Sequence, residues 1–202
     1  MPQYVQKTLQ RACQGDIYCN LTFYETRTVN GKKKETTHGY AVVLTQDCDL
    51  SEDWRNYRAI RDEGKKSHDK LLRHVILAPC YPFARFLQGE HIKDRTMSTH
   101  WNASDTTRKA IRANNHKRFH FLERQPDVNL VRLVIDFKHY FSVERDAFYE
   151  AIGKGNLYVT SLDLLFREDL SQRFAYYLAR IGLPERKPEG KPQEGPSETA
   201  GT

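Results

Sequence analysis

Five consecutive polar side chains follow directly on an apolar run in the stretch of residues 39–50. Residues 41–44 are apolar, and in the polar half that follows Cys48 stands between two carboxylates. A buried strand requires the apolar half of this pattern but gains nothing from the polar half. We therefore expect a functional site at the end of this strand. The side chains that we place in it are Gln46, Asp47, Cys48 and Asp49.

A second cysteine, Cys80, stands near the end of the next strongly apolar run, residues 74–82. If the two runs are neighbouring strands, Cys48 and Cys80 meet at one rim, where thiolate, imidazole and carboxylate ligands could hold a metal ion. The alternative is that Cys48 is a packing residue and that its neighbouring aspartates cap a turn. The spacing matches no known metal signature. We predict no metal and no other cofactor, and Cys48 and Cys80 as the ligands if a metal does bind.

Cys48 could instead act as a nucleophile, with His38 or His74 as its base. The carboxylates on either side of it disfavour the thiolate form that this chemistry needs. The sequence therefore favours this use of Cys48 less than the other two.

Positive charge is concentrated in residues 85–118. This segment has eight Lys and Arg against three Asp and Glu, a balance of +5, while the whole chain carries +6. Such a concentration indicates a polyanionic partner: cations for phosphates, an aromatic face for stacking a base, and a histidine for proton transfer. A solvated basic loop is the alternative. The predicted nucleic-acid-binding residues are Arg95, Trp101, Arg108, Lys109, Arg112, Lys117, Arg118 and His120, with His100 and His116 beside them.

The composition describes a folded protein with a polar surface. Of the 202 residues, 39% are hydrophobic and 11% aromatic, which is enough for one domain with a core. We expect that domain over residues 1–184 and a disordered tail rich in Pro, Gly, Glu and Lys over residues 185–202. No apolar run approaches a membrane span, and residues 1–7 have no signal-peptide pattern. We expect a cytoplasmic protein with reduced cysteines and no membrane partner.

The strands and helices that must position these residues are predicted from the periodicity of apolar residues and from turn and cap residues. The fold predicted is α+β and rich in strands: a small, strongly bent antiparallel β-barrel with polar helical insertions and a C-terminal helix. The side chains of Arg132, Asp136, Lys138 and His139 are expected on the solvent face of their strand. Strands are expected at residues 15–24, 36–44, 74–82, 119–123, 130–140 and 158–160, with an Asn30-Gly31 hairpin turn between the first two. Helices are expected near residues 106–113, 143–152 (with Ser142 as N-cap) and 164–181, and residues 51–73 are a helical or irregular excursion.

Three short segments resemble the PemK/MazF family. They are Gly15-Asp16-Ile17 opening a strand, the Val-Val-Leu-Thr run at residues 42–45, and the Val-Ile-Leu-Ala-Pro run at residues 75–79. The resemblance implies an SH3-like barrel, usually a homodimer, that acts as a metal-independent ribonuclease toxin. Two positions depart from the family pattern. Gly39-Tyr40 replaces the family's Arg-Pro, so its catalytic arginine has no counterpart unless His38 or Arg27 substitutes, and Tyr81 replaces its threonine.

We therefore expect a PemK/MazF-like barrel that interacts with RNA or another nucleic acid and is a candidate ribonuclease. The rim expected to face the scissile bond consists of His38, Gln46, Asp47, Cys48, Asp49 and Tyr81. The first alternative is a non-catalytic binding or regulatory subunit of a bacterial phage-defence or toxin–antitoxin assembly, with an antitoxin or defence-complex protein as partner. The second alternative is a small metal-dependent enzyme that uses Cys48 and Cys80.

Overall fold

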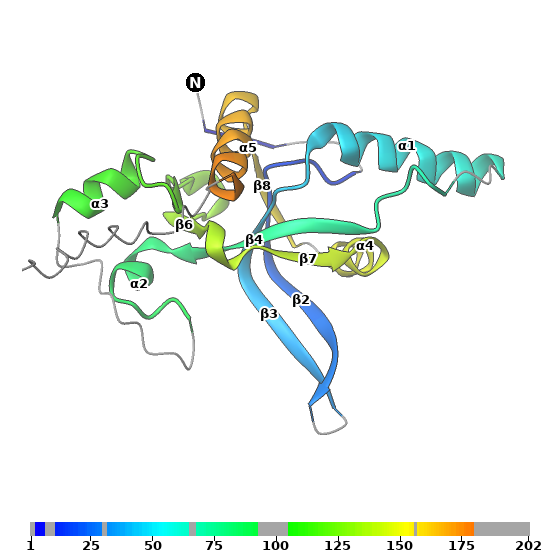
Figure 1. Cartoon of the computed structure of the whole chain (residues 1–202), viewed down its shortest axis with the longest axis horizontal. Coiled ribbons are helices and arrows are strands. Elements are labelled where there is room, and N and C mark those ends of the chain that lie inside the picture. The colour runs from blue at the N-terminus through cyan, green and yellow to red at the C-terminus, as the bar shows by residue number, and fades with distance from the viewer. Residues whose placement is uncertain are drawn as a thin grey trace, which may run out of the picture.

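The computed structural model describes residues 3–6, 11–29, 32–64, 68–92, 105–155 and 157–179, with the backbone alone at residues 24–29 and 32–34. The predicted Asn30-Gly31 turn and the predicted tail at residues 185–202 lie outside these ranges. Figure 1 shows an antiparallel sheet that curls around the centre of the molecule, with helices packed against it. The prediction of an α+β fold built on a bent antiparallel sheet is confirmed.

Eight strands form the sheet, and seven of them follow one another in the order β1-β8-β2-β3-β4-β6-β5. The central strand β4 pairs with β3 on one edge. On its other edge its first half pairs with β7 and its second half with β6. The strands are β1 (Tyr4–Val5), β2 (Asp16–Val29), β3 (Lys32–Val43), β4 (His74–Pro82), β5 (Phe119–Leu122), β6 (Leu133–Asp136), β7 (Phe141–Glu144) and β8 (Tyr158–Leu162).

The curl brings the two ends of the sheet together. The Tyr4 hydroxyl, on β1, donates to the Glu123 carbonyl just after β5 at 2.5 Å, and the Glu123 amide donates to the Gln3 side chain at 2.9 Å. Residues about 120 positions apart in the chain are joined by these two hydrogen bonds. They fix the connection that leads from β5 towards β6.

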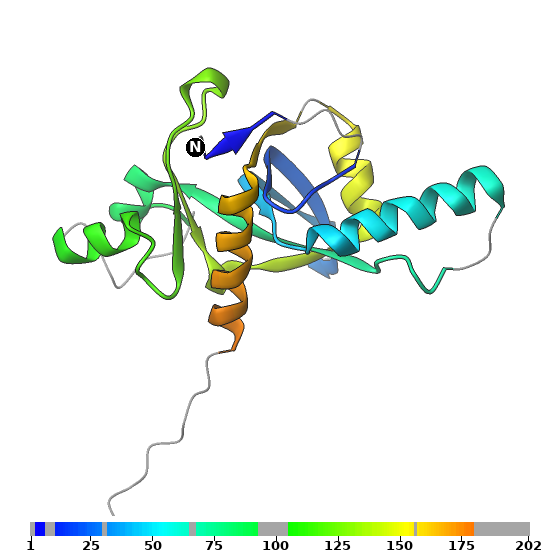
Figure 2. The same ribbon diagram turned by 90° about the horizontal axis from the view of Figure 1, so that it is seen from above.

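Helices cover both faces of the curled sheet, which explains why β4 is apolar without interruption from Val75 to Cys80. Val42 and Ala78 pack in the cluster beneath the C-terminal helix, whereas Val43 and Leu77 pack against α4 on the other face. Figures 1 and 2 show α2 and α3 at one end of the molecule, α1 and α4 at the other, and α5 between them. The helices are α1 (Asp47–Glu63), α2 (Phe83–Leu87), α3 (Asp105–Arg112), α4 (Arg145–Gly153) and α5 (Leu164–Leu178), with 3-10 turns η2 (Pro126–Val128) and η3 (Phe137–His139).

The Gly15-Asp16 pair at the start of β2 has a structural use. Gly15 adopts a φ of +80°, which a residue with a side chain rarely adopts. The Asp16 carboxylate is buried and accepts hydrogen bonds from the Cys13 amide at 2.8 Å, the Tyr18 hydroxyl at 3.2 Å and the Ser161 hydroxyl at 2.5 Å. This carboxylate therefore ties β2 to β8 and to the loop before it.

The single strand predicted over residues 130–140 is wrong. β6 ends at Asp136, whose side chain accepts from the Lys138 amide at 3.0 Å and so starts the turn η3 before β7 begins. Asp136 is completely buried, not on the solvent face as predicted, while Arg132 and Lys138 are exposed. Side-chain competition for backbone hydrogen bonds interrupts the strand here.

One helix begins before the segment 51–73 that was expected to be helical or irregular, and one predicted helix start is wrong. α1 begins at Asp47, so Asp47, Cys48 and Asp49 occupy its first turn, where their negative charges favour the helix N-terminus. Ser142 belongs to β7 instead of capping the next helix, and α4 begins at Arg145 after Glu144. Tertiary pairing of β7 with β4 extends the strand past the predicted cap.

A buried ion pair joins α1 to α4. The Arg145 side chain donates to the buried Asp53 carboxylate at 2.7 Å, and its guanidinium lies 4.5 Å from the Tyr57 ring centroid and 4.8 Å from that of Tyr149. A second carboxylate, Asp146, accepts from the same guanidinium but is 84% exposed. The same arginine therefore has one buried and one solvated partner.

This difference predicts unequal effects of removing either carboxylate. Asp53→Ala should lower the free energy of unfolding by about 3–5 kcal/mol, because it removes the buried counter-charge of the guanidinium and leaves only the solvated Asp146. Asp146→Ala is the matched control and should lower it far less, since water replaces the lost carboxylate. Urea unfolding of both variants measures the difference. Equal losses in free energy of unfolding in the two variants would contradict a larger contribution of the buried Asp53–Arg145 pair.

Candidate nucleic-acid interface

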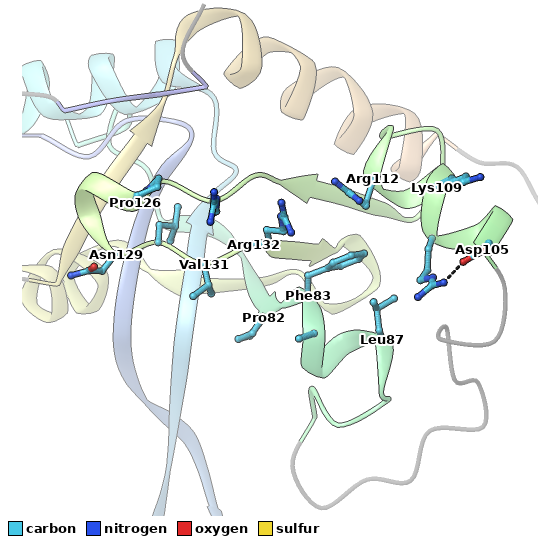
Figure 3. A pocket seen from close by; sticks show the side chains of 14 residues that line it. Pro82, Phe83, Leu87, Asp105, Lys109, Arg112, Pro126, Asn129, Val131 and Arg132 are labelled. Carbon is cyan, nitrogen blue, oxygen red and sulfur yellow. Dashed lines mark hydrogen bonds and ion pairs between the residues drawn. The ribbon is translucent and has the colours of Figure 1, made fainter.

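A groove of about 910 Å³ opens between α2, α3 and the connection from β5 to β6 (Figure 3). Its volume lies within the range of ordinary ligand pockets. We call it the basic groove, because five of its residues are Arg or Lys. Its lining consists of Pro82, Phe83, Ala84, Leu87, Asp105, Arg108, Lys109, Arg112, Arg124, Pro126, Asn129, Leu130, Val131 and Arg132.

The floor of the basic groove is apolar and rigidly supported. Phe83 and Leu87 come from α2, which begins immediately after Pro82 at the end of β4. The Phe83 ring packs against Phe121 of β5, with ring centroids 5.0 Å apart. The small cluster around Phe83 thus anchors the floor to the sheet.

The cations of the basic groove come from two elements. Arg112 is four residues from Arg108 and three from Lys109 on α3, so it lies next to both on the helix surface. The buried Ile111 packs α3 against the cluster around Phe83. Arg124 and Arg132 come from the two ends of the connection between β5 and β6.

Two of these five cations already have carboxylate partners. Arg108 pairs with Asp105, and Arg132 pairs with Glu123 at 2.5 Å. Burial would raise the pKa of Glu123, but the Arg132 hydrogen bond and neighbouring charges lower it below its ordinary value.

Lys109, Arg112 and Arg124 form no ion pair with any residue that the structure describes. The Arg112 guanidinium lies 6.0 Å from the Phe121 ring centroid. The basic groove therefore presents three cations that have no ion pair within the described part of the chain, above an apolar floor.

The structure brings together three of the eight residues predicted to bind nucleic acid. Arg108, Lys109 and Arg112 line the basic groove, whereas Lys117 is exposed outside its lining. Arg118 is paired with Asp136. Arg95 and Trp101, as well as His100, lie outside the described residues.

Sequence reasoning missed Arg124 and Arg132. Both lie beyond the segment of concentrated charge, and their neighbours in the chain include acidic residues that hide them from a charge count.

The prediction that His120 contacts nucleic acid is wrong, because this side chain is only 1% exposed. Its Nδ1 accepts a hydrogen bond from Arg173 Nε at 3.1 Å, and Arg173 also donates to the His116 and Phe119 carbonyls at 2.9 and 2.8 Å. Burial, with the charge of Arg173, lowers the pKa of His120 to about 3. The hydrogen bonds from Arg173 to His120, His116 and Phe119 attach α5 to the start of β5.

The polar residues that follow the apolar run of β3 mostly make structural contacts. The Thr45 hydroxyl accepts from the Ile76 amide at 2.7 Å. Asp47 accepts two hydrogen bonds from Arg11, both at 3.0 Å, and lies 3.6 Å from Arg167 of α5. Burial would raise the pKa of Asp47, but Arg11, Arg167 and the Gln14 amide lower it below its ordinary value. Asp47 thus links α1, α5 and the segment before β2.

Gln46, Cys48 and Asp49 remain exposed at the start of α1. The Cys48 thiol is 3.6 Å from both the Gln46 and Asp49 side-chain oxygens. These contacts lie within the polar stretch itself. No hydrogen bond or ion pair among the described residues joins this group to His38 or Tyr81.

The two cysteines considered as metal ligands have different surroundings. Cys80 is 3% exposed in the core cluster beneath α5, and burial raises the pKa of its thiol, whereas Cys48 is exposed on α1. Within the described ranges, no group of three or more His, Cys, Asp and Glu side chains is arranged to hold a metal ion. The expected absence of a metal site therefore remains a prediction.

His38 stacks on Phe141, with ring centroids 4.3 Å apart, and burial lowers its pKa below the ordinary value. It lines a second cavity of about 1000 Å³, between the β2–β3 hairpin, β7 and α4, which we call the histidine-lined hollow. His74 and His139 line the same hollow. Tyr81, the remaining residue of the predicted rim, is hydrogen-bonded to His139 at 3.0 Å.

Comparisons of this chain with protein-family models and with curated proteins find no match. No helix of the described part has the length and apolar character needed to cross a membrane.

The lowered pKa of His120 predicts how stability depends on pH. Because its folded pKa of about 3 lies below the ordinary 6.5, its contribution is fully present above pH 6.5 and is lost as pH falls towards 3. In His120→Asn, where the amide oxygen can still accept from Arg173, the free energy of unfolding should decline less steeply between these values. Urea unfolding at a series of pH values checks this, and an unchanged slope would rule out a buried neutral His120.

Proposed function

We propose that this protein binds single-stranded RNA in the basic groove. The observation that carries the proposal is the arrangement of three cations that have no ion pair among the described residues, Lys109, Arg112 and Arg124, around an apolar floor. Cations of this kind bind phosphates, and release of counterions supplies the binding free energy. Apolar and aromatic surfaces accept unstacked bases.

The shape of the site favours a single strand over a duplex. A base reaches an apolar floor only when it is unstacked and turned out of its helix. The residues that build this floor, including Phe83 and Val131, lie inside a concave groove. We therefore favour single-stranded RNA over a duplex as the ligand. The resemblance to the PemK/MazF family also suggests RNA, and the curled antiparallel sheet is compatible with that class of protein.

A protein partner is the second candidate, and exposed apolar side chains on α5 favour it. Leu164, Leu165, Tyr176 and Leu178 are each more than half exposed. Such side chains on one helix are typical of an interface with another chain. A homodimer, an antitoxin or a component of a defence complex would each satisfy this surface, and the mass of the purified protein in solution tests the first.

Replacing the three cations that carry the RNA-binding proposal tests it. The triple variant Lys109→Ala, Arg112→Ala and Arg124→Ala should bind a fluorescent RNA oligonucleotide more weakly. The slope of log affinity against log salt should become shallower by about 2, since each phosphate contact on a single strand contributes about 0.7. Fluorescence anisotropy at several salt concentrations measures both quantities.

A charge-matched control separates the groove from a general effect of net charge. Arg55, Arg58 and Arg61 are exposed on α1, so their triple replacement by Ala removes the same charge elsewhere. This control should keep the salt slope of the unmodified protein. Equal weakening by both triple variants would contradict a specific role for the basic groove.

A further inference from the structure

The histidine-lined hollow has no part in the proposed function. Its volume of about 1000 Å³ is at the upper end of the range of small-molecule pockets. Its walls come from the β2–β3 hairpin, which extends away from the body of the sheet in Figure 1, and from β7 and α4. The hollow and the basic groove share no described lining residue, so they are separate sites.

Three aromatic rings connect the hairpin wall of the hollow to β7. The His38 ring of β3 stacks on the Phe141 ring of β7, with ring centroids 4.3 Å apart and an angle of 11° between the ring planes. The Phe23 ring of β2 lies beside both, with its centroid 6.3 Å from that of His38 and 6.2 Å from that of Phe141. All three side chains are only partly buried. The hollow therefore offers an aromatic surface to a ligand.

The chemistry of this aromatic surface favours a positively charged ligand. Burial lowers the pKa of His38 below its ordinary value of 6.5, so the ring is neutral at pH 7. The faces of aromatic rings carry the negative part of a quadrupole, and they attract organic cations. An anion gains nothing from such a surface.

Carboxylates from both walls add negative charge to the hollow. Glu35 comes from β3, Glu144 from the end of β7, and Glu150 from α4, where it pairs with Lys154 at 2.5 Å. Neither Glu35 nor Glu144 forms an ion pair with a side chain that the structure describes. With histidines counted as neutral, the described lining has a charge of −2, whereas the whole chain carries +6. The hollow is thus an acidic site on a basic protein.

The placement of the carboxylates on two walls selects a ligand with more than one positive charge. A linear polyamine has cationic nitrogens at intervals along an aliphatic chain. Its nitrogens can reach carboxylates on both walls while its methylene groups and ammonium groups pack on the aromatic rings. A metal ion fits the hollow less well, because no group of three or more His, Cys, Asp and Glu in the described ranges is arranged to hold one.

We propose that the histidine-lined hollow binds a linear aliphatic polyamine. Ammonium groups of the ligand pair with Glu35 on the hairpin wall and with Glu144 on β7, and the chain between them crosses the stack of His38 and Phe141.

Uncharged polar side chains of the lining complete the site. Asn20 and Ser142 are exposed in the hollow, and their oxygens can accept hydrogen bonds from the remaining N–H groups of the ligand. An ammonium group has several donors and a carboxylate rarely satisfies all of them, so such acceptors favour a polyamine over a quaternary ammonium ion, which has no N–H group.

Calorimetric titration of the full chain with spermidine at pH 7.5 tests the proposal. Spermidine should bind with one-to-one stoichiometry, and n-butylamine, which has a single ammonium group, should bind much more weakly. The double variant Glu35→Gln and Glu144→Gln should weaken spermidine binding by about tenfold, as expected for the loss of two solvent-accessible ion pairs. Phe141→Leu should weaken it by about threefold, because it removes an aromatic face from the hollow.

A charge-matched control separates the hollow from a general attraction of cations. Glu52→Gln with Glu168→Gln removes the same two charges from exposed positions on α1 and α5, and it should leave spermidine affinity unchanged. Thermal unfolding without ligand identifies any variant whose loss of binding reflects loss of fold. Added spermidine should raise the unfolding temperature of the unmodified protein and of this control, but much less that of the Glu35 and Glu144 double variant.

Three results would overturn the polyamine site. The first is an absence of spermidine binding at millimolar concentration, and the second is equal weakening by the two double variants. The third is binding of a tri-lysine peptide without binding of spermidine, which would assign the hollow to a segment of a protein. RNA binding in the basic groove is measured separately, so failure of either proposal leaves the other in place.

Discussion

The two-sided pairing of β4 is the constraint on which the rest of the structure depends. This strand is hydrogen-bonded on both edges and packed on both faces, so its residues from Val75 to Cys80 are largely buried. Its last two residues stay paired with β6 and reach two candidate sites: Tyr81 is hydrogen-bonded to His139, which lines the histidine-lined hollow, and Pro82 lines the basic groove. A displacement of β4 would therefore move both sites together.

Buried aspartates connect the elements that surround this strand. Asp16 ties β2 to β8, Asp53 ties α1 to α4, and Asp136 ties the segment before β5 to η3. Each carboxylate is fully buried and accepts at least two hydrogen bonds, which offset the cost of removing it from water. Asp136 differs from the other two because its partners Arg118 and His139 are partly exposed, so this network connects the interior to the surface.

Charge and shape together define what the surface can bind. The chain carries a net charge of +6, but some of its cations serve the fold. Arg118 and Arg173, for example, form hydrogen bonds that hold distant parts of the chain together. Only a few of the Lys and Arg residues of the chain line the basic groove. Those that do converge on one apolar floor (Figure 3). Convergence of this kind, more than the total charge, distinguishes a binding site from a basic surface.

The sequence by itself determined the main strands, the C-terminal helix and the location of basic residues on α3, because apolar periodicity and local charge report on nearby residues. The tertiary structure decided which polar side chains meet. Tyr81 and His139 are 58 residues apart, and Arg173 lies 53 residues from the His120 that it helps to bury. No local pattern distinguishes the partly exposed His139 from the buried His120, since burial depends on which distant helix or strand packs against each residue. The polar stretch after residue 44, conspicuous in the sequence, mainly joins α1 to its neighbours, whereas Tyr81, Asp136 and His139 meet only because β4, β6 and η3 lie together in the folded chain.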